Sequence, residues 1–75
     1  MRKKLRARRK SLGYTQQEVA DHVGIVRTYY SEIELGNRNC DIKIWLKIAE
    51  FLKIEEADLI SYVKEGLKGA YRRGA

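Results

Sequence analysis

The sequence predicts a small all-α domain of five short helices. Three observations lead to this prediction: proline is absent, glycines separate apolar segments with helical spacing, and no segment alternates polar and apolar residues like a strand. A chain of 75 residues has room for one domain, which buries only about 60% of its unfolded surface. One cysteine and one histidine provide neither a disulfide nor a zinc set, so we expect no metal.

The first two helices are expected on either side of Gly13. One covers about residues 2–12 and ends at that glycine. Thr15, followed three residues later by Glu18, has the spacing of a capping box and begins a second helix over about residues 16–23. The expected inward residues are Leu5 and Leu12 in the first helix, and Val19, Ala20 and Val23 in the second.

Three more helices follow. The third covers about residues 27–35 and ends at Gly36, and the fourth covers about residues 42–52 with Asp41 as its N-cap. The fifth begins near Glu55, because acidic residues favour a helix N-terminus. The expected inward residues are Tyr30 and Ile33 in the third helix and Ile42, Trp45, Leu46, Ala49 and Leu52 in the fourth, while the fifth helix carries the apolar residues Leu59, Ile60 and Val63.

Positive charge is concentrated at the two ends of the chain. Sixteen Lys and Arg against ten Asp and Glu give a net charge of +6. Residues 1–10 hold seven cations and no acid, residues 64–75 hold four cations and one acid, and residues 11–63 are net −4. We expect a domain over residues 1–65 and a frayed basic C-terminal tail over residues 66–75. A basic chain favours an anionic partner, either nucleic acid or an acidic membrane surface.

The basic ends have three interpretations: arms that contact DNA, solvated tails, or a membrane-surface helix. The cations Arg2, Lys3 and Lys4 are better candidates for DNA contact than Arg72 and Arg73 at the other end. The N-terminal helix lacks the wide apolar face that a membrane-surface helix needs. No apolar run approaches the roughly 20 residues that span a bilayer, and no apolar region follows the basic start as in a signal peptide. With a free Cys40, these features predict a cytoplasmic protein without membrane contact.

The second and third helices have the pattern of a helix-turn-helix. Gly24 lies in the short turn that joins them, where a positive φ is needed, and small Ala20 lets the two helices approach closely. This part of the chain resembles the Cro/cI-type helix-turn-helix proteins of phage repressors and small bacterial regulators. The resemblance covers about residues 5–60 and implies a lambda-repressor-like fold. The residues that carry it are Arg9, Thr15, Gln16, Glu18, Ala20, Gly24, Arg27, Ile33, Glu34, Gly36, Lys47, Ile48, Ala49 and Leu52.

The resemblance implies that the helix over residues 27–35 lies in the major groove of double-stranded DNA. With Tyr30 and Ile33 inward, steps of 100° per residue put Thr28, Ser31 and Glu32 on the opposite face of the helix, toward the groove. Arg27, at the helix N-terminus, can bond guanine bidentately, and Glu32 either accepts from cytosine or excludes wrong sites as a solvated acid. The expected base contacts are Arg27, Thr28, Ser31 and Glu32.

Phosphate contacts are expected around this helix. Gln16 and Gln17 lie at the N-terminus of the preceding helix, where amide donors and the helix dipole suit a phosphate. Tyr29 lies on the flank of the reading face, where its hydroxyl suits a phosphate. The resemblance adds Asn37 and Arg38 after the third helix.

Several tempting residues have structural interpretations. The resemblance pairs Arg9 with Glu34 as a partly buried ion pair between the first and third helices. His22 is expected to face solvent rather than phosphate, and Cys40 is interpreted as a loop thiol rather than a redox sensor. Tyr30 is expected in the core, with its hydroxyl reaching an edge.

A second apolar stripe on the fourth helix suggests a dimer. Ile44, Ile48 and Phe51 are apolar outside the expected core stripe, and further apolar residues follow downstream. The resemblance offers a core position for Ile48, which leaves Ile44 and Phe51. These side chains are either scattered surface residues or a homodimer interface, and two-fold dimers that read two half-sites are the rule for this motif. The expected interface residues are Ile44, Phe51, Ile60, Val63 and Leu67.

Together these features predict a sequence-specific transcriptional regulator that binds a palindromic operator as a homodimer. Of the two signs of regulation, repression is the predicted one. The main alternative is an antitoxin that caps a toxin and regulates its own promoter. We expect no enzyme and no cofactor, because the side chains form no catalytic constellation.

Overall fold

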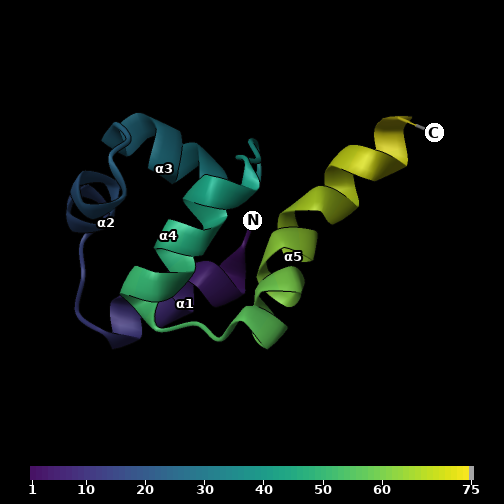
Figure 1. The fold of residues 1–75 in the computed structure, drawn as a ribbon. Helices are drawn as coiled ribbons and strands as arrows, with labels where there is room; N and C mark the ends of the chain where they lie inside the picture. Colours follow the sequence, from purple (N-terminus) through teal and green to yellow (C-terminus); the bar gives the residue numbers. More distant parts are fainter. Residues whose placement is uncertain (75) are drawn as a thin grey trace.

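Residues 1–74 contain five helices and no strand, so the all-α prediction is confirmed. The computed structural model describes the backbone of these residues and the side chains of residues 1–65. The helices are α1 (Lys3–Ser11), α2 (Gln16–Val23), α3 (Arg27–Leu35), α4 (Ile42–Leu52) and α5 (Glu56–Gly74) (Figure 1).

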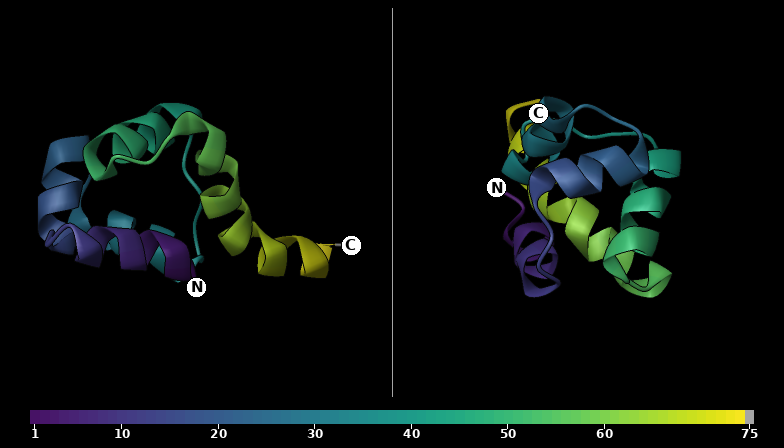
Figure 2. Two further views of the ribbon diagram at one scale, coloured as in Figure 1. Left: turned by 90° about the horizontal axis from the view of Figure 1, so that it is seen from below. Right: turned by 90° about the vertical axis from the view of Figure 1, so that its left-hand side faces the viewer.

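Helix α4 stands at the centre of the fold. It contacts α2 on one side and α5 on the other, while α3 packs against α2 (Figure 1). Helix α1 contacts both α3 and α5 and so joins the two sides of the molecule (Figure 2). This arrangement leaves one face of α3 uncovered by any other helix of the described chain.

Two of the helix starts are capped as the sequence predicted. Thr15 Oγ1 accepts a hydrogen bond from Glu18 N (3.1 Å), and Glu18 Oε1 accepts one from Thr15 N (2.8 Å), which completes the capping box. Asp41 Oδ1 accepts from Ile44 N at the start of α4 (3.1 Å). These bonds satisfy backbone N–H groups that have no partner inside the helix.

Gly24 makes the turn between α2 and α3 possible. Its φ of +89° lies in the left-handed region, while the space around a Cβ at this position is open. The requirement for glycine is therefore conformational rather than steric. The N–H groups of Gly24 and Ile25 both donate to Ala20 O, which ends α2 and directs the chain into α3.

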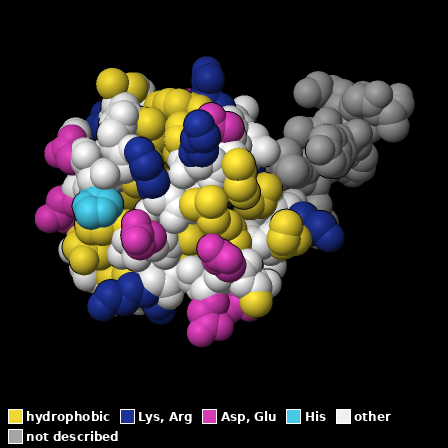
Figure 3. Space-filling view, in the orientation of Figure 1, with side chains coloured by type: hydrophobic (Ala, Val, Ile, Leu, Met, Phe, Trp, Pro, Cys, Tyr) yellow, Lys and Arg dark blue, Asp and Glu magenta, His cyan; other side chains and the backbone are white. Residues whose placement is uncertain are grey.

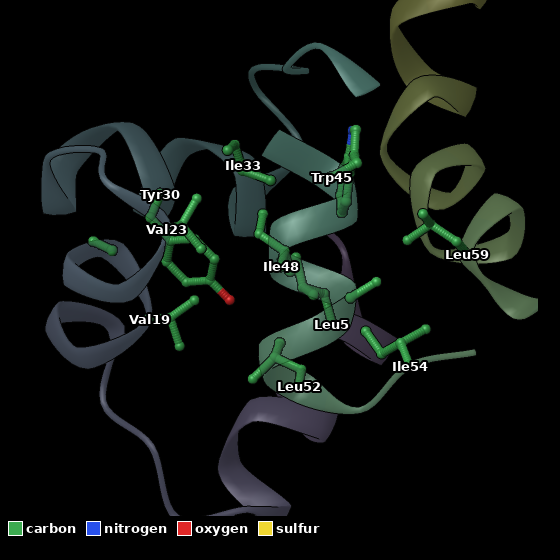
Figure 4. Close-up of a cluster of buried hydrophobic side chains, with 12 residues drawn as sticks. Leu5, Val19, Val23, Tyr30, Ile33, Trp45, Ile48, Leu52, Ile54 and Leu59 are labelled. Carbon is green, nitrogen blue, oxygen red and sulfur yellow. The ribbon is translucent and has the colours of Figure 1, made fainter. Parts of the chain in front are cut away.

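The hydrophobic core lies between α4 and the four surrounding helices (Figure 4). Tyr30 and Ile33 reach it from α3, so the inward face of that helix is the predicted one. With the inward face occupied, the opposite face of α3 is available to a ligand. The buried apolar side chains are Leu5, Val19, Ala20, Val23, Tyr30, Ile33, Trp45, Ile48, Ala49, Leu52, Ile54 and Leu59.

The predicted core stripe of α4 is partly wrong. Ile42 and Leu46 are exposed (62% and 41%), and Ile48 is fully buried in their place. The core of α4 is therefore centred between Trp45 and Ile48, rotated away from the predicted stripe. The expectation failed because α4 is apolar around most of its circumference, so that periodicity alone could not choose its inner face.

Arg2 is fully buried, which contradicts the interpretation of this residue as part of a DNA-binding arm. Its guanidinium donates to the carbonyl oxygens of Ile33 (2.7 Å), Arg38 (3.0 Å), Tyr62 (3.2 Å) and Val63 (3.2 Å). It donates further to Asn39 Oδ1 (3.4 Å) and lies 5.0 Å from the centre of the Trp45 ring. The residue therefore connects α3, the following loop, α4 and α5. Burial lowers the pKa of its guanidinium, and the nearby thiol of Cys40 and carboxylate of Glu65 oppose this shift.

Helix α5 is longer than expected. Its backbone is helical to Gly74, where the sequence suggested fraying after residue 65. The side chains of residues 66–75, including the interface candidate Leu67, lie outside the described part. The division into a domain and a tail remains a prediction.

Candidate nucleic-acid interface

The outward face of α3 carries the four predicted base-contacting residues. Arg27 and Thr28 are exposed in the first turn, and Ser31 and Glu32 are partly exposed one turn later. The spacing of Thr28, Ser31 and Glu32 puts them on the side opposite Tyr30 and Ile33, which are fixed in the core, and Arg27 lies beside them at the N-terminus of the helix. The face presents a guanidinium, two hydroxyls and a carboxylate, and these groups can donate to or accept from base edges.

Base-contact and phosphate-contact candidates meet in one shallow hollow beside α3. The hollow has a volume of about 320 Å³ and is lined by Val26, Thr28, Tyr29, Glu32 and Arg38. The Arg38 guanidinium carbon lies 5.1 Å from the centre of the Tyr29 ring, which orients this cation next to α3. Thr28 and Glu32 thus lie within one surface feature together with Tyr29 and Arg38.

The loop after α3 is held in place by hydrogen bonds from the buried side chains of Arg2 and Trp45. Arg38 and Asn39 both accept hydrogen bonds from the buried Arg2, and Asn39 Oδ1 also accepts from Trp45 Nε1 (2.8 Å). Asn37 N donates to Glu32 O (3.1 Å), which continues the end of α3. The side chains of Asn37 and Arg38 remain exposed. A fixed loop with exposed amide and guanidinium groups is suited to bind phosphate.

The two glutamines at the start of α2 already have partners within the chain. Gln16 Nε2 donates to Glu34 Oε1 (3.1 Å), and Gln17 Nε2 donates to Asp21 Oδ1 (2.8 Å). Gln16 is half-buried and Gln17 is exposed. Each amide has a second hydrogen that is free to donate to a phosphate, and this contact stays a prediction.

An ion pair joins α1 to α3 directly behind this face. Arg9 Nε lies 2.6 Å from Glu34 Oε2, and Arg9 Nη2 donates to Glu34 Oε1 (3.3 Å), with both residues buried. Arg9 Nη1 also donates to Tyr14 O (2.8 Å). The structure therefore contains the pair that the resemblance implied. Burial would raise the pKa of Glu34, but hydrogen bonds, above all from Arg9, outweigh it and hold this pKa below its usual value.

The Tyr30 hydroxyl lies next to this ion pair. The side chain is fully buried, and among the described residues the hydroxyl has no partner at hydrogen-bond geometry. Burial raises the pKa of Tyr30, and the negative charge of Glu34 adds to the shift. The phenol is therefore neutral. Because the hydroxyl oxygen is buried, the expectation that it reaches an edge of the core was wrong.

His22 faces solvent and Cys40 lies in a loop, as the sequence predicted, and His22 additionally stacks on an aromatic ring. The exposed His22 ring stacks on Phe51 with ring centres 4.0 Å apart, and Phe51 also stacks on Tyr14 at 4.4 Å. Burial raises the pKa of the Cys40 thiol to about 11. A thiol with this pKa is protonated at neutral pH, which makes it a poor redox sensor.

The apolar residues predicted for a dimer interface lie in different environments. Ile44, Phe51 and Val63 are half-buried against their own core, and only Ile60 is largely exposed (61%). The Phe51 ring is stacked on Tyr14 and His22, and its place in an interface stays a prediction. The larger exposed side chains of this region are Ile42 and Leu46 on α4 and Ile60 on α5.

Figure 3 shows hydrophobic side chains gathered over α4 and α5, with Lys, Arg, Asp and Glu side chains around them. Ile42 and Leu46 are four residues apart and lie on one side of α4. We use the name α4–α5 patch for the three exposed residues Ile42 and Leu46 on α4 and Ile60 on α5; Leu46 lines a shallow hollow together with Glu56, one helical turn before Ile60. No helix among residues 1–74 is both long enough and apolar enough to cross a membrane.

The comparison with protein families decides what this arrangement is. Residues 3–65 match the helix-turn-helix domain family, and this span covers all of α1–α4 and the first half of α5. The chain belongs to the helix-turn-helix family. With five helices and α2–α3 as its helix-turn-helix, it has the predicted lambda-repressor-like fold. The family is one of transcriptional regulators, which implies that the domain binds DNA.

Two proteins of Bacillus subtilis are similar to this chain. The uncharacterized HTH-type transcriptional regulator YqaF is 44% identical over 52 residues, which cover 69% of this chain and 68% of YqaF. The SPbeta prophage-derived uncharacterized HTH-type transcriptional regulator YonR is 37% identical over 51 residues, covering 68% of this chain. The match spans about half (47%) of the length of YonR. No solved structure matches this chain significantly.

Sequence reasoning missed the roles of two arginines of the N-terminal segment, of which Arg2 supports the interface and Arg8 holds the end of α4. Arg2 was grouped with the exposed cations, yet it is the link between α3, its following loop and α5. Arg8 donates to the carbonyl oxygens of Leu52 (2.8 Å) and Lys53 (2.9 Å), where α4 ends in a left-handed lysine (φ 57°). The sequence marks Arg8 only as a cation at a position where the resembled family often has an apolar core residue, and it does not distinguish Arg2 from the neighbouring cations, because the direction of each side chain depends on tertiary packing.

Proposed function

We propose that this domain is a sequence-specific repressor that reads the major groove of double-stranded DNA with the outward face of α3. The observation that carries the proposal is the face of α3 opposite the core, where Thr28, Ser31 and Glu32 reach the surface, with Arg27 exposed at the N-terminus of the same helix. Membership of the helix-turn-helix family supplies the partner class. The fixed loop with Asn37 and Arg38, the start of α2 with Gln16 and Gln17, and Tyr29 would set the register on the phosphates.

The electrostatics of the chain support a division of labour. Helix α3 itself carries Arg27 against Glu32 and Glu34, so that it contributes little general attraction for DNA. Exposed cations elsewhere, such as Lys3, Arg6 and Lys10 on α1, provide that attraction. Affinity would then depend on salt through the cations of α1, and sequence preference would depend on α3.

A selection from a random duplex library tests this function. The expected product is an enriched duplex with a recognisable half-site that recurs as a palindrome when the protein is dimeric, bound at least 10³-fold more tightly than a scrambled duplex at physiological salt, a typical lower limit for specific binding. Arg27→Ala and Glu32→Gln should change the selected sequence, whereas exchange of the exposed Lys43 for Ala should leave it unchanged. If no duplex is enriched over random DNA, the proposal is wrong.

The α4–α5 patch supports a homodimer. Its apolar side chains are accompanied by charges of both signs, with Lys43 and Lys47 on α4 and acidic Glu50 and Glu56 nearby. A two-fold interface pairs one surface with itself, and such a mixed surface can be self-complementary. We therefore centre the proposed interface on Ile60 together with Ile42 and Leu46, with Ile44, Phe51 and Val63 as partly buried neighbours.

Sedimentation velocity at micromolar concentration tests the dimer. The expected result is a dimer for the unmodified chain and a folded monomer for Ile60→Glu, with Val26→Glu as the control at an equally exposed aliphatic position. The dimer would bind two half-sites about 34 Å apart on a palindromic operator. A folded monomer in the unmodified chain would overturn the dimer and would favour the alternative, an antitoxin that covers the α4–α5 patch with a toxin.

A further inference from the structure

The guanidinium of Arg2 uses all five of its N–H groups inside the protein. An arginine side chain carries five such donors in a planar fork. Arg2 is 1% exposed, and its donors are used once at Nε, twice at Nη1 and twice at Nη2, so that none is left for DNA. The acceptors are the carbonyl oxygens of Ile33, Arg38, Tyr62 and Val63 and the side-chain Oδ1 of Asn39.

These acceptors belong to two separate parts of the fold. Three of them lie at the end of α3 and in the loop after it, which carries the phosphate-contact candidates Asn37 and Arg38. The other two are consecutive carbonyl groups of α5, at residues 62 and 63. Nη2 donates to one acceptor of each part, Asn39 Oδ1 and Val63 O, so a single planar group joins the loop to α5.

The end of α3 receives its cation from Arg2. The last turn of α3 contains no basic residue of its own, although a positive charge near a helix C-terminus is favourable. Arg2, at the start of α1, supplies this charge: its backbone N donates to Glu34 O (2.7 Å), and its Nη1 donates to Ile33 O (2.7 Å). Arg2 therefore binds the point at which the proposed reading helix ends and the loop begins.

A second set of contacts fastens the same end of α1 to α5, beside which the N-terminus lies in Figure 1. Helix α1 begins without a side-chain cap and without an acidic residue in its first turn. Glu65 of α5 supplies an acceptor, because its Oε1 accepts a hydrogen bond from the backbone N of Lys4 (3.0 Å). Lys4 Nζ in turn donates to Ser61 Oγ of α5 (2.9 Å). The position of Arg2 against α5 therefore depends on Glu65 as well as on its own guanidinium.

We propose that Arg2 is a positioning residue for DNA binding, which fixes the loop over residues 37–39 against α5 without touching DNA itself. With Arg2 in place, the side chains of Asn37 and Arg38 are held exposed beside α3, where Arg38 lies over the Tyr29 ring. Without the guanidinium, the loop keeps its sequence and charge but loses its attachment to α5, and its phosphate contacts weaken. The inference rests on the proposed function, because it makes part of the same DNA interface dependent on α5.

Arg2→Lys is the first test, because it keeps the positive charge and removes the planar fork. A lysine ammonium has three donors at one point and cannot reach the acceptors of the loop and of α5 together. On the duplex obtained in the library selection, Arg2→Lys should bind about 5-fold more weakly, the size expected for one lost hydrogen-bonded contact. The slope of log affinity against log salt should also fall by about 1, although the net charge is unchanged. A residue that only stabilises the fold would leave this slope unchanged in the folded variant.

A double-mutant cycle shows whether Arg2 acts through the loop. Arg38→Ala removes the candidate phosphate contact itself and should also weaken binding about 5-fold. Because both substitutions remove the same contact, the double variant should stay near 5-fold, whereas independent effects would multiply to about 25-fold. Lys3→Ala is the control, since Lys3 is exposed on α1 away from the loop and its effect should multiply with that of Arg2→Lys. Thermal denaturation of each variant fixes a temperature at which all of them are folded.

Glu65→Ala approaches the same link from α5 and tests the inference if Arg2→Lys does not fold. It removes the acceptor at the start of α1 and changes none of the DNA-contact candidates. We expect weaker binding that is not weakened further by Arg38→Ala. Removal of an acid by itself strengthens the attraction to DNA, so the matched control is Glu55→Ala, which removes the same charge from an exposed residue just before α5. This control should bind at least as tightly as the unmodified protein.

Three results would overturn the inference. The first is a folded Arg2→Lys variant with unchanged affinity and unchanged salt slope. The second is a loss of about 25-fold in the double variant with Arg38→Ala, which means that the two residues act independently. The third is a Glu65→Ala variant that binds as tightly as Glu55→Ala. Any of these on a selected duplex ends this inference and leaves the proposed function intact, whereas failure to select a duplex ends both.

Discussion

Two glutamates on α3, only two residues apart, have opposite environments. Glu34 is buried and bonded to Arg9 and Gln16, whereas Glu32 lies on the outward face and lines the open hollow. The difference comes from helical geometry, because two steps of 100° carry a side chain to the other side of the helix. One face of α3 is thus committed to holding the fold, and the other is free to read DNA.

The largest expected effect is on the inner face. Arg9→Ala leaves the Glu34 carboxylate buried without its cation, and breaking such a pair costs about 3–5 kcal/mol of folding free energy. For a small domain this is a large part of the total stability. Urea denaturation measures the loss, and Arg6→Ala is the control, because Arg6 is exposed on the same helix. A variant with normal stability and weakened DNA binding would contradict the structural role of Arg9.

The second prediction concerns stability at low pH, to which the two glutamates should contribute differently. The pKa of Glu34 is lowered in the folded protein, so its carboxylate stabilises the fold above its ordinary value of 4.5. This contribution is lost as the pH falls from about 4.5 through the lower pKa of the folded state. The urea midpoint should therefore fall on acidification, and Glu34→Gln should flatten this dependence.

Glu32→Gln is the matched control for the acid experiment. It removes the same charge from the same helix, but from a side chain on the outward face. We expect the pH dependence of its urea midpoint to follow that of the unmodified protein. An equal flattening by the two substitutions would show that the inner and outer faces do not differ in the way described.

The smallest effect is expected outside α3. Lys3 is exposed on α1 and lines a hollow with Arg6 and Lys10, where no acidic residue contributes. Lys3→Ala should weaken binding to all duplexes alike and reduce the slope of log affinity against log salt by about 1. Titrations at several salt concentrations measure the slope. A change of sequence preference in this variant would contradict the division between phosphate attraction and base reading.

The fold was predictable where local rules decide. The Thr15–Glu18 box, the Asp41 cap and the turn glycine Gly24 each depend on neighbours in sequence, and the structure contains all of them. Tyr30 and Ile33 marked the inner face of α3 because the spacing of its apolar residues is unambiguous. The face available for DNA follows directly from these two residues.

Other features depend on tertiary packing and were not predictable. Ile42 and Ile48 are chemically alike, and the packing of α4 against α2 and α5 leaves one exposed and the other buried. Arg2 belongs to a run of cations, but the carbonyl groups that hold it come from residues more than 30 positions away. A basic run in a sequence therefore does not distinguish a buried connecting residue from a surface charge.

The central claim is that the outward face of α3 reads DNA sequence, and Arg27→Ala tests it most directly. Affinity is measured on the selected duplex and on variants with each base pair changed, together with the thermal midpoint of both proteins. We predict a loss of about 1–3 kcal/mol in binding, relaxed preference at one base pair of each half-site, and an unchanged thermal midpoint. Unchanged affinity and an unchanged base-pair profile in the folded variant would contradict the claim.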